Sequence, residues 1–203
     1  MSHNTTQPID RELPEFSRMQ QVKRRFFAMR NGMLADQMRS RGLSYKVNFG
    51  LNIPQIKEIA ADLLASGMTS SEQLELACRL WENMNTRESR LLAPMIFPAD
   101  IMPRETAMLW LSEAQTTEIA DHLCHSLLRR LPFAAEIATE LFNTPGATSL
   151  QRYSSLRLLL NLVATGRLDP VPLEPLASAA LNDPVARPVA RQLMEEIEFS
   201  KEI

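Results

Sequence analysis

The chain has 203 residues, enough for one domain or a short repeat array with a large core that needs neither disulfides nor metal. Hydrophobic residues at 45% and charged residues at 23% exclude a disordered chain, and the net charge of −2 argues against a basic nucleic-acid-binding domain unless arginines gather on one face. The two cysteines, Cys78 and Cys124, occupy apolar helical positions, and neither a signal peptide nor a membrane-spanning run is visible. These features predict a cytoplasmic protein.

The chain is expected to begin with a disordered polar lead over residues 1–15, followed by a single helical domain over residues 16–203. One long helix is predicted over residues 16–41, and Gly42 is expected to end it. Its apolar residues recur at spacings of three and four, the period of an α-helix. They are Met19, Val22, Phe26, Met29, Met33 and Leu34.

The starts of the next helices carry capping signals. In a capping box, a polar first residue and a Glu or Gln three positions later satisfy each other's backbone N–H groups. Three such pairs are expected to begin helices here: Asn52 with Gln55, Thr69 with Glu72, and Asn85 with Glu88.

Further helices are expected over residues 103–111, 116–131, 132–142, 148–164, 172–181 and 183–199. The second helices of successive pairs begin near positions 86, 117, 148 and 184, a spacing of about 31 to 36 residues that is typical of helical repeats. The short connectors favour antiparallel neighbours. The prediction is an all-α, HEAT-like α-solenoid of about five antiparallel helix pairs with a concave groove. A compact irregular bundle is the alternative.

Asp121 is the first candidate site residue, because it lies at the edge of the apolar face of the helix over residues 117–131. A partly desolvated carboxylate at such an edge can act on a ligand, although position alone favours a surface aspartate paired with His125. The polar side chains His122, Cys124 and His125 point in directions too different to converge on one ion. No metal or other cofactor is therefore expected.

Arg152 is the second candidate, because it lies on an apolar stripe of the helix over residues 148–164 and would need a partner for its charge. Asp121 is the expected partner, in a structural ion pair or in a groove that handles charge. Other arginines near the starts of second-of-pair helices could form a ladder along a phosphate backbone, or could be locally paired surface charges. They are Arg87, Arg90, Arg187 and Arg191.

Two stretches resemble the AlkD-like DNA alkylation repair family. The sequence FGLNIPQIKEIA from Phe49 is similar to that family's G-V-x-x-P-x-(I/L)-(R/K)-x-(I/L)-A pattern. The Leu80–Trp81 pair, followed by Arg87-Glu88-Ser89-Arg90, resembles its L-W … h-E-x-R pair. The resemblance extends from about residue 26 to residue 199.

This resemblance implies a HEAT-like solenoid that binds damaged duplex DNA in its groove and hydrolyses the glycosidic bond of N3- or N7-alkylated purines. It also implies that Asp121 corresponds to the essential aspartate and Arg152 to an arginine of the following second-of-pair helix. The family often has tryptophans where this chain has Thr117 and, near its end, residues 190–194. The alternative is therefore a catalytically silent solenoid that binds undamaged DNA or a protein partner.

Overall fold

The computed structural model describes residues 15–202, and within them it contains α-helices, short 3-10 turns and no β-strand. The only β-type contact in this part of the chain is an isolated bridge between Val47 and Thr86. The eleven α-helices are α1 (Glu15–Ala28), α2 (Gly32–Ser40), α3 (Ile53–Ala65), α4 (Ser70–Glu82), α5 (Arg87–Ile96), α6 (Arg104–Ser112), α7 (Thr117–Ser126), α8 (Ala134–Asn143), α9 (Ser149–Val163), α10 (Glu174–Ala180) and α11 (Arg187–Glu202). The predicted disordered lead lies outside the described residues, apart from Glu15 at the start of α1.

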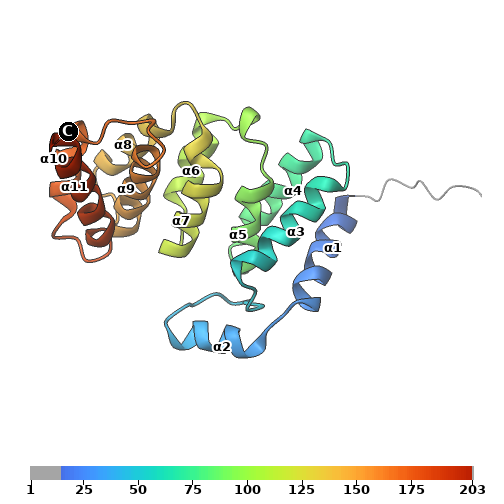
Figure 1. Cartoon of the computed structure of the whole chain (residues 1–203). Helices are drawn as coiled ribbons and strands as arrows, with labels where there is room; N and C mark the ends of the chain where they lie inside the picture. Colours follow the sequence, from blue (N-terminus) through green and yellow to red (C-terminus); the bar gives the residue numbers. More distant parts are fainter. Residues whose placement is uncertain (1–14, 203) are drawn as a thin grey trace, which may run out of the picture.

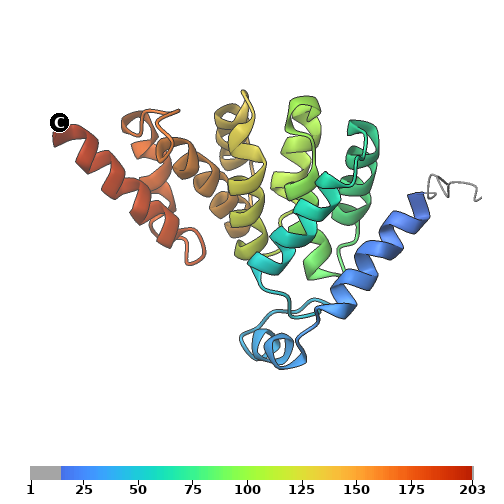
Figure 2. The same ribbon diagram turned by 45° about the vertical axis from the view of Figure 1, so that its right-hand side comes forward.

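The helices after residue 52 stand side by side in series, as Figures 1 and 2 show. Helices α3, α5, α7, α9 and α11 contact one another in that order and form one row. Helix α4 packs on α5, α8 on α9 and α10 on α11, while α6 packs on α8, so these helices form a second row behind the first. The predicted all-α class is confirmed.

The predicted long helix over residues 16–41 is wrong, because the chain breaks into α1 and α2 after residue 28. Asn31 adopts an extended conformation and its side chain accepts a hydrogen bond of 3.0 Å from the backbone N–H of Leu34. Asn31 therefore caps a new helix, and the apolar spacing continues across the break without requiring one continuous helix. In both views α2 lies apart from the two rows.

Two of the three predicted capping boxes are confirmed, at Asn52–Gln55 and at Thr69–Glu72. The third is wrong. Helix α5 has Thr86 at its N-cap, with no side-chain capping bond, and Glu88 is completely buried instead of reaching back along the helix.

Apolar side chains from both rows form one continuous core. At its centre the rings of Trp81 and Trp110 stack with centroids 4.3 Å apart, and Phe97 packs edge-on against Trp110. Both tryptophans are buried, so their predicted place in the core is confirmed. Within the described residues, no helix is long and apolar enough to cross a membrane.

The connector between α2 and α3 passes very close to the start of α2 at Gly50. This residue has φ of +72°, a conformation that glycine adopts without strain. A Cβ atom at this position would lie 2.1 Å from the carbonyl oxygen of Asn31. Glycine is therefore required here both by the backbone conformation and by the close approach of α2.

Candidate functional site

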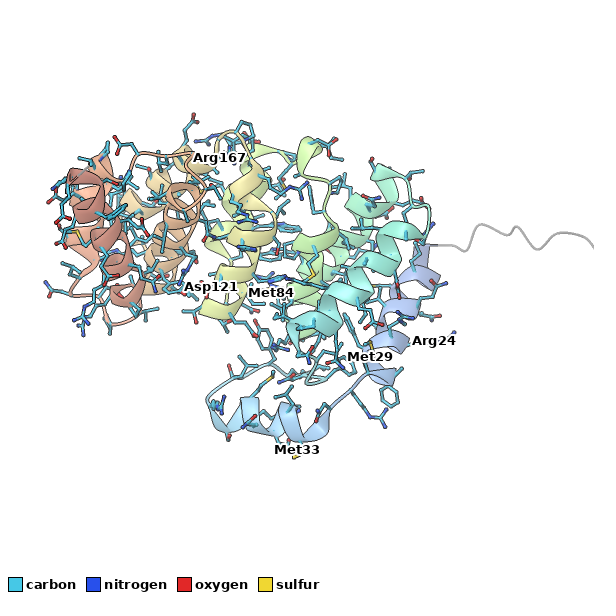
Figure 3. All side chains as sticks on the ribbon, viewed as in Figure 1. Arg24, Met29, Met33, Met84, Asp121 and Arg167 are labelled. Carbon is cyan, nitrogen blue, oxygen red and sulfur yellow. The ribbon has the colours of Figure 1, made fainter. Side chains whose placement is uncertain are left out.

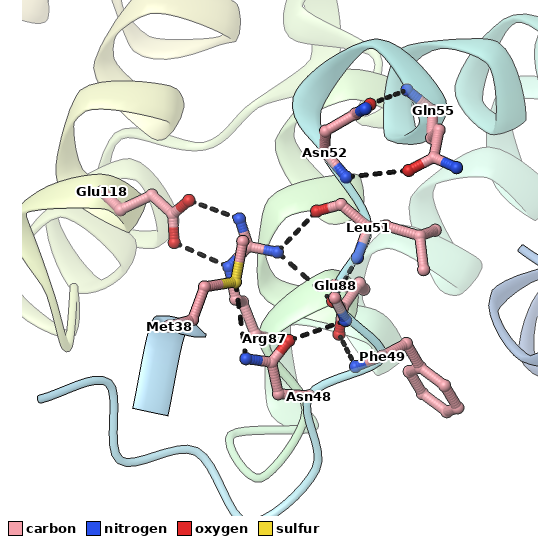
Figure 4. Close-up of polar contacts among 10 residues, drawn as sticks. Met38, Asn48, Phe49, Leu51, Asn52, Gln55, Arg87, Glu88 and Glu118 are labelled. Carbon is pink, nitrogen blue, oxygen red and sulfur yellow. Dashed lines mark hydrogen bonds and ion pairs between the residues drawn. The ribbon is translucent and has the colours of Figure 1, made fainter. Parts of the chain in front are cut away.

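Arg87 occupies the centre of a buried polar network at the starts of α5 and α7 (Figure 4). Its guanidinium donates to Glu118 at 2.8 Å and 2.5 Å, and to the carbonyl oxygen of Leu51 at 2.8 Å. Glu88 lies 3.2 Å from Arg87 Nη1 and accepts hydrogen bonds from the backbone N–H groups of Phe49 and Leu51. The network therefore joins α5, α7 and the connector before α3.

Arg90, one turn further along α5, is equally buried. Its guanidinium lies 3.5 Å from the ring centroid of Trp81 and donates to the carbonyl oxygens of Trp81 and Glu113 at 2.7 Å and 2.5 Å. Burial lowers the pKa of Arg90 to about 10. These contacts are structural cation–π and hydrogen-bonding interactions inside the core.

The positions of Arg87 and Arg90 contradict the predicted arginine ladder. Their exposed fractions are 1% and 0%, and each guanidinium donates to carboxylate or carbonyl oxygens of the protein, although Arg90 Nε has no acceptor among the described residues. Neither side chain can reach a phosphate without unfolding its surroundings. Arg187 and Arg191, at the start of α11, are exposed as a phosphate contact requires.

A cleft of about 380 Å³ opens where the front-row helices α3, α7 and α9 meet. All of the residues that line it except Ile53 carry polar or charged groups. The lining residues are Ile53 and Lys57 from α3; Glu118, Asp121, His122 and His125 from α7; and Arg157 and Asn161 from α9. Glu118 connects the cleft to the buried network of Arg87.

Asp121 lies within this cleft, near the start of α7 (Figure 3). Its Oδ1 atom accepts a hydrogen bond of 2.7 Å from the Tyr153 hydroxyl and lies 2.8 Å from Arg157 Nε. The Arg157 contact is an ion pair but not a hydrogen bond, because that N–H does not point at a hydrogen-bond acceptor among the described residues. Arg157 Nη2 donates instead to the Tyr153 hydroxyl, at 3.2 Å.

One oxygen of Asp121 is therefore fixed and the other is available. The side chain is 46% exposed, and Oδ2 has no hydrogen-bond partner within residues 18–202. The hydroxyl of Tyr153 stays protonated at neutral pH, because burial and then the hydrogen bond to Asp121 raise its pKa to about 12. The result is an oriented, charged carboxylate that faces a cleft, as electrostatic stabilisation of a cation requires.

Arg157, and not Arg152, is the arginine that pairs with Asp121, so the predicted partner is wrong. Arg152 lines neither the cleft nor its rim. Its charge acts instead on Asp183, just before α11. Burial raises the pKa of the Asp183 carboxyl, but the net shift is downward. The lowering comes from hydrogen bonds donated by Ala186, Ser149 and Val185 and from the positive charge of Arg152. The alternative pairing of Asp121 with His125 is also not observed among the described contacts.

Two residues of this site, Tyr153 and Arg157, were not predicted from the sequence. They lie four residues apart on α9, so they share one face of the helix, and that spacing was the available signal. Helix α9 is buried over most of its circumference, and its apolar pattern does not show which of its polar residues turn toward α7.

The imidazole of His122 is uncharged at neutral pH. Burial, followed by the positive charges of Lys57 and His125, lowers its pKa from 6.5 to about 4. Burial and then Arg129 lower the pKa of the exposed His125 as well. A neutral imidazole does not add positive charge to the cleft, so it does not oppose the binding of a cationic group.

We expect His122 to make the protein sensitive to acid. Between pH 6.5 and pH 4 the unfolded chain binds a proton that the native His122 does not, so stability falls as pH falls through this window and is constant above it. Relative to His122→Gln, the wild type should lose about 2 kcal/mol more unfolding free energy between about pH 7 and about pH 5. Urea unfolding at both pH values measures this difference. The matched variant His125→Gln should show less of it, and equal acid sensitivity in the wild type and His122→Gln would contradict the assignment.

No group of three or more His, Cys, Asp or Glu side chains within the described residues is arranged to hold a metal ion.

Comparison with protein families gives one match. A family model described as DNA alkylation repair enzyme matches residues 22–144, more than half of the chain, and includes α7 with Asp121 and His122. No curated protein and no solved structure shows significant similarity to the chain.

Proposed function

We propose that this protein, which belongs to the DNA alkylation repair enzyme family, binds alkylated duplex DNA and hydrolyses the glycosidic bond of N3- or N7-alkylated purines at the Asp121 cleft. The single observation that carries the proposal is the geometry of Asp121. Its carboxylate is held at one oxygen by Tyr153 and Arg157 and faces the cleft with the other.

The chemistry of alkylated purines suits such a carboxylate. Alkylation at N3 or N7 gives the base a positive charge, so the base leaves as a neutral molecule when it takes the electron pair of its bond to C1′. Positive charge then develops on the sugar as an oxocarbenium ion. A fixed anion such as Asp121 stabilises that charge, and an interaction of this kind contributes roughly 10²–10³ in rate. Water adds to C1′, and its proton passes to solvent.

The remaining residues of the cleft have supporting roles in this proposal. Tyr153 and Arg157 orient Asp121, and the uncharged His122 lines the pocket without repelling a cationic base. The series of helix pairs is proposed to curve as a HEAT-like solenoid, with the cleft on its concave side. The exposed residues Arg187 and Arg191 remain the predicted phosphate contacts on α11, whereas Arg87 and Arg90 do not.

The direct test is base release. The full chain is incubated with duplex DNA containing N7-methylguanine or N3-methyladenine, and the free methylpurine is measured by chromatography. We expect release well above the rate without protein, and none from the unmodified duplex. Release at the uncatalysed rate for both lesions would contradict the proposed reaction and favour the catalytically silent alternative.

A further inference from the structure

The net charge of −2 conceals a strong separation of charge along the chain. Residues 18–50 contain eight lysines and arginines and one acidic residue, a net charge of +7. Residues 51–202 contain thirteen basic and twenty acidic residues, a net charge of −7. The basic segment consists of α1 from Arg18 onward, α2 and the connector up to Gly50, and is called the basic arm below.

We propose that the basic arm is the surface that binds the phosphate backbone of duplex DNA beside the Asp121 cleft. This inference rests on the proposed function and names the element that supplies its affinity for DNA. Sequence-independent DNA affinity comes from cations that neutralise phosphates. Of the arginines expected to supply them, Arg87 and Arg90 are buried and only Arg187 and Arg191 on α11 are exposed, while the described chain after Gly50 is acidic overall.

Half of the eight cations of the arm are free for an external ligand. Two of its arginines hold α1 in place, through ion pairs of Arg18 with Glu72 on α4 and of Arg25 with Asp62 on α3. Four other cations are exposed and form no hydrogen bond or ion pair through their side chains within the described part of the chain. They are Lys23, Arg24, Arg41 and Lys46.

Within the arm, α1 packs on α4, α2 projects from the helix rows, and the connector after α2 ends at the cleft. Helix α2 stands apart from the rows in both ribbon views. After Lys46 the connector is bound by Glu88, through the N–H groups of Phe49 and Leu51. Arg87 holds the carbonyl oxygen of Leu51 and also Glu118, which lines the cleft.

The chain then continues directly into the cleft wall. Helix α3 begins at Ile53, and both Ile53 and Lys57 line the cleft. Arg41, Lys46 and Lys57 are thus exposed cations that follow one another from the arm to the cleft. A duplex whose damaged nucleotide occupies the cleft would have its flanking phosphates next to these cations.

The test compares two double variants with the same change in charge. Arg41→Glu with Lys46→Glu alters the arm. Arg104→Glu with Arg130→Glu is the matched control. Arg104 begins α6 in the back row, and Arg130 lies in the turn after α7. Arg167 donates to the carbonyl oxygen of the neighbouring Arg129, and Figure 3 shows Arg167 at the end of the molecule opposite Asp121. Binding of a fluorescent undamaged duplex is followed by anisotropy between about 50 and 200 mM salt. Thermal melting checks that each variant is folded.

We expect the arm variant to bind at least about tenfold more weakly at low salt, and its log–log salt slope to fall by about 2, one for each phosphate that is no longer neutralised. The control should change affinity by less than about twofold, because its cations lie away from the duplex. Equal reductions in the two variants, or a wild type that does not bind duplex at low salt, would overturn the inference. So would binding to phosphatidylserine vesicles without binding to duplex, which would assign the arm to a membrane surface. Because the probe is undamaged, failure of base release would refute the proposed catalysis and leave this inference standing.

Discussion

Replacing Asp121 with asparagine should reduce the release of methylpurine by at least about 10²-fold, with little change in melting temperature. Asparagine keeps the shape of the side chain and an oxygen that can accept the Tyr153 hydrogen bond. It removes the negative charge that stabilises a cationic sugar. The cost in unfolding free energy is small, about 1 kcal/mol or less, because the Asp121 side chain in the ion pair with Arg157 is about half-exposed to solvent.

Single-turnover release and thermal melting of the same variant measure the two effects separately. The matched control is Asp62→Asn on α3, another exposed carboxylate that pairs with an arginine, and both of its readouts should stay near wild type. A mutant that unfolds several degrees earlier but releases base at the wild-type rate would assign Asp121 a structural role instead.

Replacing Arg87 with methionine should lower the free energy of unfolding by about 4 kcal/mol. Methionine fills much of the same volume, but Glu88, which is 0% exposed, loses its nearest positive charge. A buried carboxylate without a compensating charge is strongly destabilising. The loss should appear as a fall in melting temperature of about 10 °C for a chain of this size.

Urea unfolding with Arg104→Met as the control distinguishes a buried network from a surface ion pair. Arg104 pairs with Glu140 at 2.6 Å, but both side chains are exposed, so its loss should leave the free energy of unfolding close to that of the wild type. The double variant Arg87→Met with Glu88→Gln should be less destabilised than the sum of its single variants, because the two charges are coupled. A cost below about 1 kcal/mol for Arg87→Met would contradict the role of the network.

The sequence predicted the features that depend on neighbouring residues. The capping boxes at Asn52 and Thr69 involve contacts three residues apart, and both form. The same logic failed at Glu88, because its partners Phe49 and Leu51 lie 39 and 37 residues away and outcompete the local cap. Tertiary hydrogen bonds of this kind leave no periodic signal in the sequence.

Only some of the site residues were predicted, because the others depend on contacts between helices that leave no periodic signal in the sequence. Asp121 was found because α7 has a clear apolar face with the aspartate at its edge. Arg152 was predicted from its apolar stripe on α9, and Arg157, which lies five residues later and about 140° around the helix, was not considered. Because α9 is buried over most of its circumference, only its packing against α7 shows that Arg157 turns toward Asp121.

The charge of the chain illustrates a further limit. A net charge of −2 gave no indication of DNA binding, and the arginines with repeat spacing, Arg87 and Arg90, are in the core. The positive charge is concentrated in the segment before Leu51, of which residues 16–41 were predicted as a single amphipathic helix. The chain breaks before Asn31, which caps α2, and α2 therefore lies apart from the helix rows instead of continuing α1.

The central claim is that the Asp121 carboxylate stabilises positive charge on a sugar in DNA. The most direct measurement compares the affinity of the protein for two duplexes that differ in one group, a cationic pyrrolidine or a neutral tetrahydrofuran in place of the damaged nucleotide. We predict that the wild type binds the cationic duplex at least about tenfold more tightly and that Asp121→Asn binds both equally, since an oriented charge pair of this kind is worth about 1.4 kcal/mol or more. Equal affinity of the wild type for the two duplexes would contradict the claim.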